Sequence, residues 1–297
     1  MKPADRTRHQ PKRAHLSCRW PLFRCGICAS VLVALFAVLA LLLFDFDQML
    51  SSVARSWNLG QQEYGAALAP VPSLPENPDA SGSDWDDGAS GAENIETLKT
   101  VAARGDPIAQ KRLGWVYMNG FGAVAQDFAE AKSWFRKAAD QDDAGAERIL
   151  GWMYQEGRGV DQDDAEAVVW YRKAADQGNA VAQNNLGWMY QEGRGVDQDD
   201  AKAVFWYRKA AGRGNGIAQY NLGWMHEQGR GVTQDDSQAL GWYRTAAGQG
   251  IVNAQMSLGW MYQEGRGVDQ DDAKAAAWYR KAAEQGNPTA QKSLGLM

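Results

Sequence analysis

The sequence has few of the residues that build disulfides, metal centres and covalent catalytic sites. Its 297 residues include three cysteines, all at or before residue 28, and three histidines. The long C-terminal part therefore has no thiol to protect and suits an oxidising compartment as well as a reducing one. Cys25 and Cys28 have the spacing of half a zinc or redox motif, but the partner ligands are missing. We expect no metal, no cofactor and no catalytic activity.

Motifs for phosphate, calcium and glycoside chemistry are also missing. The Gly-Arg-Gly turns follow helical patterns and lack a subsequent Lys-Ser or Lys-Thr, which excludes a P-loop. The segments VDQDDA lack the sixth-position glycine and closing glutamate of a calcium loop. Glu156, Glu192 and Glu264 recur at the same place of different repeats, too far from one another to act as an acid–base pair. His226 aligns with Tyr190, so we expect a hydrogen-bonded core histidine rather than a base.

The N-terminal third of the sequence is divided into segments that differ in charge and hydropathy. Seven Lys or Arg residues and one acid precede residue 27, and residues 27–44 form an uncharged apolar run. As a helix this run would be about 27 Å long, close to the hydrocarbon thickness of a bilayer. By the positive-inside bias, the tail 1–26 stays cytoplasmic without binding nucleic acid, and the chain beyond crosses the membrane. A signal peptide cleaved after Ala54 is the alternative to this signal anchor.

Residues 45–92 are rich in Pro, Ser, Gly, Asp and Ala and have no helical or strand period. Such a composition cannot bury enough apolar surface to fold, so we expect a disordered acidic linker. Its root-mean-square reach would be roughly 35–40 Å. The linker would therefore tether whatever follows near the membrane.

Residues 93–297 consist of repeats. The block GWMYQEGRGVDQDDA occurs three times, beginning at Gly151, Gly187 and Gly259, and a variant begins at Gly223. A divergent copy begins at Gly114 with a loop one residue longer, and a last fragment begins at Gly295. Self-similarity at a period of 36 residues predicts an all-α solenoid of about five helix-turn-helix units, with residues 95–104 as a leading half-repeat.

Each unit contains two helical patterns, which we name helix A and helix B. Helix A carries Ala182, Leu186 and Tyr190 on one stripe, and Gly187 lets a neighbouring helix approach closely. Asn or Asp precedes helix A as an N-cap, Gly193 and its equivalents end it, and helix B stops at a glycine. Helix B starts at an Asp-Asp pair, where Asp163 and Glu166 predict a capping box.

The repeats resemble the Sel-one-like repeat family, which is related to the tetratricopeptide repeats. Its pattern, roughly A-x-x-LG-x-MY-x-x-G-x-GV-x-x-D-x-x-KA-x-x-WY-x-KAA-x-x-G, is matched at nearly every position from Ala146 onward. The resemblance implies a right-handed superhelix whose A helices line the concave surface. It also implies adaptor or scaffold roles, in some bacterial members within the cell envelope.

Tryptophan supplies the candidate binding residues. The repeats contain two tryptophans each, one in the family's WY pair on helix B, where we expect packing, and one directly after the helix A glycine. By resemblance to tetratricopeptide modules, Asn184 and Gln191 join this second tryptophan in facing a ligand. The alternative is that each ring packs on the next A helix. The predicted aromatic ladder consists of Trp115, Trp152, Trp188, Trp224 and Trp260.

The sequence thus favours a non-catalytic, membrane-anchored interaction scaffold whose groove takes a protein, a peptide or a glycan. The solenoid would lie outside the cytoplasm, which means the periplasm if the source is a Gram-negative bacterium. A regulatory accessory subunit of an envelope sensor kinase or of a polysaccharide or cell-wall machine is an alternative that the sequence cannot separate from it. A cell-wall hydrolase is disfavoured because no nucleophile or metal constellation is present.

The topology has a direct test. An enzyme reporter that is active only outside the cytoplasm, fused after Leu296, should be active, because seven bases precede the apolar run and nine acids lie within residues 45–94. The mass of the mature chain separately distinguishes a retained anchor from a signal peptide removed after Ala54. A reporter active only in the cytoplasm contradicts the predicted orientation.

Overall fold

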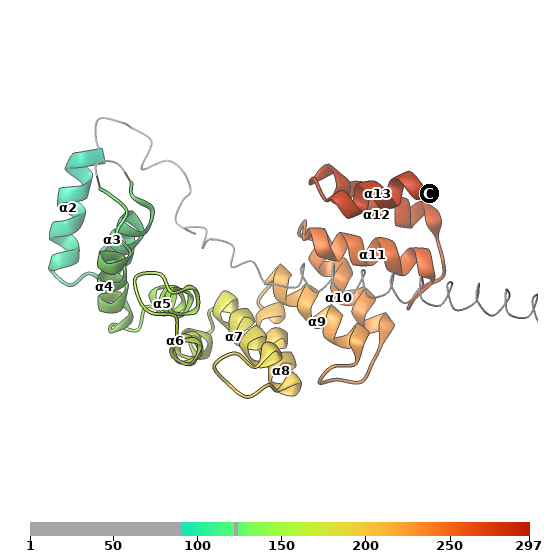
Figure 1. Cartoon of the computed structure of the whole chain (residues 1–297), viewed down its shortest axis with the longest axis horizontal. Coiled ribbons are helices and arrows are strands. Elements are labelled where there is room, and N and C mark those ends of the chain that lie inside the picture. Colours follow the sequence, from blue (N-terminus) through green and yellow to red (C-terminus); the bar gives the residue numbers. More distant parts are fainter. Residues whose placement is uncertain (1–90, 122–123) are drawn as a thin grey trace, which may run out of the picture. The chain divides into compact units, whose positions relative to one another are not determined.

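The computed structural model describes residues 91–121 and 124–297, and within these ranges all regular structure is helical. Figure 1 shows the helices following one another in chain order. Their bounds are α2 (Gly91–Ala103), α3 (Pro107–Asn119), α4 (Phe128–Ala139), α5 (Ala144–Glu156), α6 (Asp164–Asp176), α7 (Ala180–Glu192), α8 (Asp200–Gly212), α9 (Gly216–Gln228), α10 (Asp236–Gly248), α11 (Val252–Glu264), α12 (Asp272–Glu284) and α13 (Pro288–Leu296).

The helices pair as five repeats, from α3 with α4 to α11 with α12, in which the odd-numbered helix is helix A and the even-numbered one is helix B. Each helix packs mainly against its neighbours in sequence, first within a repeat and then across the joint to the next one. α2 precedes the first repeat and α13 follows the fifth. The predicted α-solenoid with a leading half-repeat is confirmed.

Side-chain caps set the helix starts, and left-handed glycines end the A helices. The carboxylate of Asp143 and the amide oxygens of Asn179 and Asn215 accept hydrogen bonds from backbone N–H groups in the first turn of the A helices. Gly193 adopts φ 65° at the end of α7, a conformation that glycine reaches without steric cost. The fifth repeat is an exception, because Ile251 stands at the N-cap of α11 and provides no side-chain bond.

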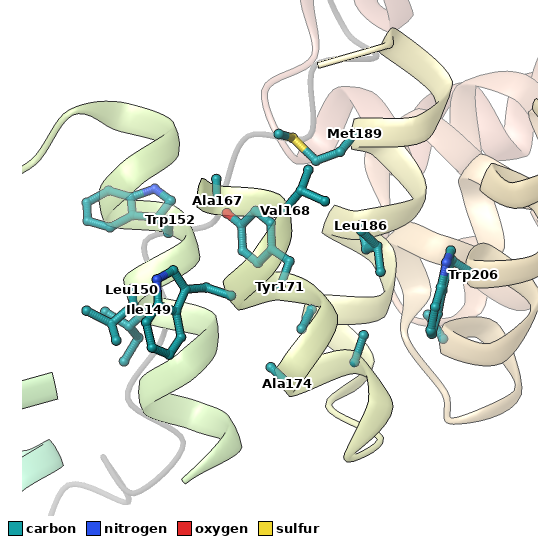
Figure 2. Close-up of a cluster of buried hydrophobic side chains, with 14 of the residues drawn as sticks. Ile149, Leu150, Trp152, Ala167, Val168, Tyr171, Ala174, Leu186, Met189 and Trp206 are labelled. Carbon is teal, nitrogen blue, oxygen red and sulfur yellow. The ribbon is translucent and has the colours of Figure 1, made fainter. Parts of the chain in front are cut away.

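The core of each repeat is a ring packed on a glycine. A Cβ atom on Gly187 would lie 2.8 Å from the Tyr207 ring, which is fully buried. The hydroxyl of Tyr207 donates a hydrogen bond to Gln191 Oε1 at 2.8 Å, so the buried ring packs against the glycine and its polar end has a partner. Figure 2 shows the equivalent Tyr171 among side chains from α5 and α7, including Leu150 and Leu186. The predicted close approach at Gly187 is confirmed.

A second glycine sets the joint between repeats. Gly195, in the loop after α7, has φ 67°, and a Cβ atom there would lie 2.1 Å from the carbonyl oxygen of Asp164, at the start of α6 in the preceding repeat. Gly159, Gly231 and Gly267 make the same contact with the preceding helix B. The Gly-Arg-Gly turn is therefore a contact between two backbones, which explains its second glycine.

Some details differ from the sequence-based predictions. Asp163 does cap α6, but the carboxylate of Glu166 accepts a hydrogen bond from Trp170 Nε1 at 2.9 Å, so the predicted capping box was wrong in its second half. His226 is half-buried and its Nδ1 atom has no hydrogen-bond partner, unlike the satisfied core histidine we expected. The predicted membrane segment 27–44 lies outside the described residues. No helix that is described has the length and apolar character needed to cross a membrane.

The joint glycine gives a stability prediction. We expect Gly195→Ala to lower the free energy of unfolding by about 2–4 kcal/mol, because the new methyl group meets a carbonyl oxygen and the backbone stays left-handed. The matched control is Gly241→Ala in the middle of α10, where nothing lies within 4 Å of the added Cβ. That change should raise the stability by about 0.5–1 kcal/mol through helix propensity. Urea unfolding of both variants measures the contrast, and equal stabilities would refute the role of Gly195.

Candidate functional site

An arginine of each Gly-Arg-Gly turn holds two repeats together. Arg194, after α7, pairs with Asp164 at the start of α6 through two hydrogen bonds, Nε to Oδ2 at 2.9 Å and Nη2 to Oδ1 at 2.7 Å. Both side chains are about one-third exposed, and the bidentate geometry fixes the register of one repeat against the preceding repeat. The same pair recurs 36 and 72 residues later as Arg230–Asp200 and Arg266–Asp236.

The tryptophans of the predicted ladder lie beside these arginines. The guanidinium carbons of Arg194, Arg230 and Arg266 lie 5.1, 5.2 and 4.8 Å from the ring centroids of the helix A tryptophans of their own repeats. This geometry is typical of cation–π contacts. The tryptophans concerned are Trp188, Trp224 and Trp260, and each is half-buried against the core.

The first two members of the ladder are more deeply enclosed. Trp115 is 8% exposed and packs edge-on against Phe135, with ring centroids 6.0 Å apart. Trp152 is 7% exposed and its Nε1 atom is buried without a hydrogen-bond partner. The five rings are therefore parts of the repeat core and its joints. Only the last three present a substantial edge to solvent, and ligand binding by the ladder stays a prediction.

Asn184 and Gln191 lie inside the array rather than on its surface. Asn184 is 2% exposed, and its Oδ1 accepts a hydrogen bond from Asn221 Nδ2 in the next A helix at 3.0 Å. Gln191 is 4% exposed and is engaged by Tyr207 and by the carboxylate of Glu192. In the free solenoid both amides already have partners, so a ligand would have to displace them.

The first joint is built differently from the later ones. Phe128 occupies the place of the aspartate, and the guanidinium carbon of Arg158 lies 5.5 Å from its ring centroid. An ion pair between Lys111 Nζ and Asp143 Oδ2, at 3.0 Å, links the same two repeats. A cation–π contact and a separate ion pair thus replace the bidentate pair of the other joints.

Two buried glutamates stand where other repeats have glutamine. Glu147 is 2% exposed, and burial raises its pKa from 4.5 to about 7, while Lys173 partly offsets this. Gln177 Nε2 donates to its Oε2 atom at 2.7 Å, as Gln249 Nε2 donates to Gln219 in another repeat. Glu227 takes the place of Gln191, and burial raises its pKa too. Because the fold raises the pKa of both carboxyls, the stability of the array depends on pH.

Arg148 is a half-buried base that forms no ion pair with an acid of the described residues. The half-buried Lys111, Arg194, Arg230 and Arg266, by contrast, each pair with an aspartate. Burial lowers the pKa of its guanidinium, and the electrostatic interaction with Tyr171 partly offsets this. It lies on helix A two residues before the core leucine. The side chains at this place in successive repeats are Lys111, Arg148, Asn184, Tyr220 and Met256.

Sequence reasoning missed the Arg–Asp pairs and Arg148. The second aspartate of each Asp-Asp pair was assigned to helix capping alone, although its regular distance of 30 residues from the turn arginine was a usable signal. No cluster of His, Cys, Asp or Glu in the described ranges could hold a metal ion. Together these residues form an extended array of joints, beside a row on helix A whose side chains differ from repeat to repeat.

Glu147 yields a pH-dependent prediction. Because its pKa in the fold lies above the ordinary value, the fold favours the neutral carboxyl and loses stability as the pH rises from 4.5 to about 7. Glu147→Gln should therefore leave stability near pH 5 almost unchanged and raise it at pH 8 by about 1–3 kcal/mol. Melting curves at both pH values measure this. Glu284→Gln, at an exposed site on α12, is the control, and an equal gain there would contradict the assignment.

Known proteins match this chain along the repeats. The family described as Sel1 repeat matches residues 107–143, 144–179, 180–215, 216–251 and 252–287. No curated protein matches the sequence.

Two solved structures are similar to it. A protective antigen of uropathogenic Escherichia coli that displays an SLR fold is 45% identical, with a TM-score of 0.66, over 68% of this chain and 43% of that one. A Sel1 repeat protein of Oxalobacter formigenes is 37% identical, with a TM-score of 0.65, over 69% of this chain and 82% of that one. The alignment with the antigen thus spans less than half of the antigen's chain.

Proposed function

This chain belongs to the Sel1 repeat family, and from that premise we propose that it is a non-catalytic protein–protein interaction scaffold. The proposal includes an anchor at residues 27–44 and a solenoid on the extracytoplasmic side of the cytoplasmic membrane. Its partner is a protein segment that lies along the A helices. The charge asymmetry of the first 94 residues supports the anchor and its orientation.

One observation carries the binding role, namely a row on helix A whose chemistry changes from repeat to repeat beside joints that stay the same. The joints repeat the same glycine contact and, at three of them, the same Arg–Asp pair. The helix A position two residues before the core leucine instead changes from base to amide, aromatic and thioether along the chain. Stacking fixes the uniform residues, whereas side chains that differ from repeat to repeat can give specificity. Asn184, Tyr220 and Met256 are buried in the array, so the half-buried Lys111 and Arg148 are the members of the row that a partner can reach directly.

Arg148 indicates the chemistry of the partner. A guanidinium in a partly desolvated site has five donors, and a carboxylate is the group that matches them in geometry and charge. Lys111 occupies the same row one repeat earlier, where it pairs with Asp143, so Arg148 is the base of this end of the row that has no ion pair among the described residues. We infer that an acidic segment of the partner lies there, with the half-exposed edges of Trp188 and Trp224 farther along the array.

Two other functions are less well supported. An accessory subunit that regulates an envelope kinase or a polysaccharide machine would use the same surface, so it is a special case of the scaffold. A cell-wall hydrolase would need a carboxylate pair in one cleft, and the exposed Glu156, Glu192 and Glu264 lie one or two repeats apart. A glycan ligand would need free aromatic faces, and arginines lie over three of the five helix A rings.

The proposal predicts an arginine-dependent capture. The full chain, solubilised with membranes of its source cells after chemical cross-linking, should retain a discrete partner. Arg148→Met should reduce that capture at least about tenfold, because a hydrogen-bonded ion pair to a buried group contributes about 1.5–3 kcal/mol. The control is Arg280→Met, at an exposed site on α12.

The companion variant Trp188→Ala separates packing from binding. If the ring only packs, the change should lower the free energy of unfolding by roughly 2–4 kcal/mol, because a half-buried indole leaves a cavity. If it also binds, capture by the folded protein falls as well. Equal capture by the wild-type chain, Arg148→Met and Arg280→Met would refute the acidic-partner scaffold.

A further inference from the structure

The outer faces of two consecutive B helices carry large apolar side chains that the core does not use. Val169 on α6 and Phe205 on α8 hold the same place in successive repeats and are 48% and 51% exposed. Phe205 lies about 160° around α8 from the fully buried Tyr207, which packs against helix A of its own repeat. The other repeats have small residues at this place, namely Ser133, Gly241 and Ala277. The apolar pair is therefore a local feature of two repeats that packing does not require.

Basic side chains follow each apolar residue by one helical turn. They stand three and four residues after Val169 and Phe205, which places them on the same face of each helix, and they are exposed. These bases are Arg172 and Lys173 on α6, and Arg208 and Lys209 on α8. Lys209 Nζ lies over the Phe205 ring, 4.6 Å from its centroid. Cation and apolar group thus form one surface.

None of these bases forms an ion pair with an acid of the described residues. On α4, by contrast, Arg136 pairs with Asp140 four residues later at 2.9 Å. Gly212 holds the place of that aspartate on α8, and the next residue, Arg213, adds a fifth exposed base. Its guanidinium reaches the preceding repeat, because a Cβ atom on Gly178 would lie 2.6 Å from its Nη2 atom. We call the two apolar residues and these five bases the outer patch.

We propose that the outer patch lies on the anionic phospholipids of the bilayer in which the chain is anchored. Aromatic and aliphatic side chains insert at the boundary between headgroups and acyl chains, and the lysines and arginines around them meet the lipid phosphates. A nucleic acid fits this surface less well. Its bases stack on free aromatic faces, but Val169 has no ring and Lys209 covers one face of Phe205.

The inference rests on the proposed anchor at residues 27–44, which keeps the solenoid near one bilayer. Five bases and two apolar side chains give only a weak contact by themselves. A tether makes that contact intramolecular and gives it a high effective concentration. Because Phe205 points away from helix A, the contact leaves the row that contains Arg148 open to a partner. The membrane thus orients the array without covering the proposed binding surface.

Site-specific quenching tests this orientation in the full chain, with Cys18, Cys25 and Cys28 replaced by serine. A fluorophore is attached at Ala201→Cys, on the outer face of α8, or at Val181→Cys, an exposed site on helix A of the same repeat. The chain is reconstituted in phosphatidylcholine vesicles that contain about 30% phosphatidylglycerol and a nitroxide-labelled lipid. Quenching of the probe at position 201 should be at least about threefold greater than at position 181. The difference should disappear in phosphatidylcholine alone and in about 0.5 M NaCl, which screens the charges.

Matched variants test the residues of the patch. Lys209→Glu and Lys281→Glu remove the same local contact, because each lysine lies over the helix B tryptophan of its repeat, 4.7 and 4.1 Å from the ring centroid. The repeat of Lys281 has Ala277 in the place of Phe205. Lys209→Glu should abolish the difference between the two probes, and Phe205→Ala should reduce it at least about twofold. Lys281→Glu should leave it unchanged, and all three variants should keep the circular dichroism spectrum of the wild type.

The outcomes separate the anchor from the patch. Flotation with phosphatidylcholine vesicles reports on the anchor alone, so a chain that does not float refutes the anchor. Equal quenching of the two probes in the anchored chain, or an equal effect of Lys209→Glu and Lys281→Glu, would overturn the membrane contact. A DNA duplex that displaces the outer patch from anionic vesicles would also overturn it and would assign the patch to a nucleic acid.

Discussion

The contact of a loop glycine with the backbone of the preceding repeat is the constraint on which the array depends. At Gly195 and its equivalents the chain lies so close to the first turn of a helix B that no Cβ atom fits. That approach brings the turn arginine within reach of the aspartate at the same helix start, and the guanidinium then lies over the tryptophan of helix A. Backbone contact, ion pair and ring packing are therefore one unit, repeated at each regular joint.

Because the joints are so alike, the departures from the repeat stand out as places with their own chemistry. Phe128 changes an ion pair into a cation–π contact, and Ile251 removes an N-cap. Glu147 and Glu227 introduce titratable groups where an amide would serve, at the cost of burying a carboxyl. His226 stands where a tyrosine hydroxyl accepts from an arginine in the repeats before and after, as Tyr262 does from Arg244. Uniform stacking thus coexists with local differences in electrostatics.

The period, the two helices of each unit, the N-caps and the close approach at Gly187 could all be predicted, because each depends on residues a few positions apart. The Arg194–Asp164 pair was missed, because its regular spacing of 30 residues indicates a pair only once it is known how one repeat stacks on the next. The same holds for the site. The place of Trp188 on helix A was predictable, but its partial burial depends on the loop of its own repeat. Gln191 was expected to face a ligand, whereas Tyr207 from helix B occupies its amide oxygen.

The uniform joint also bears on how such a gene can change. An in-frame duplication or loss of 36 codons between Gly151 and Gly259 joins a turn to a helix start of the same kind as before. No apolar face is opened and no carboxylate loses its arginine, because each joint involves only adjacent units. The number of units can therefore change without disrupting the joints that remain. Selection can adjust the length of the array in steps of one unit.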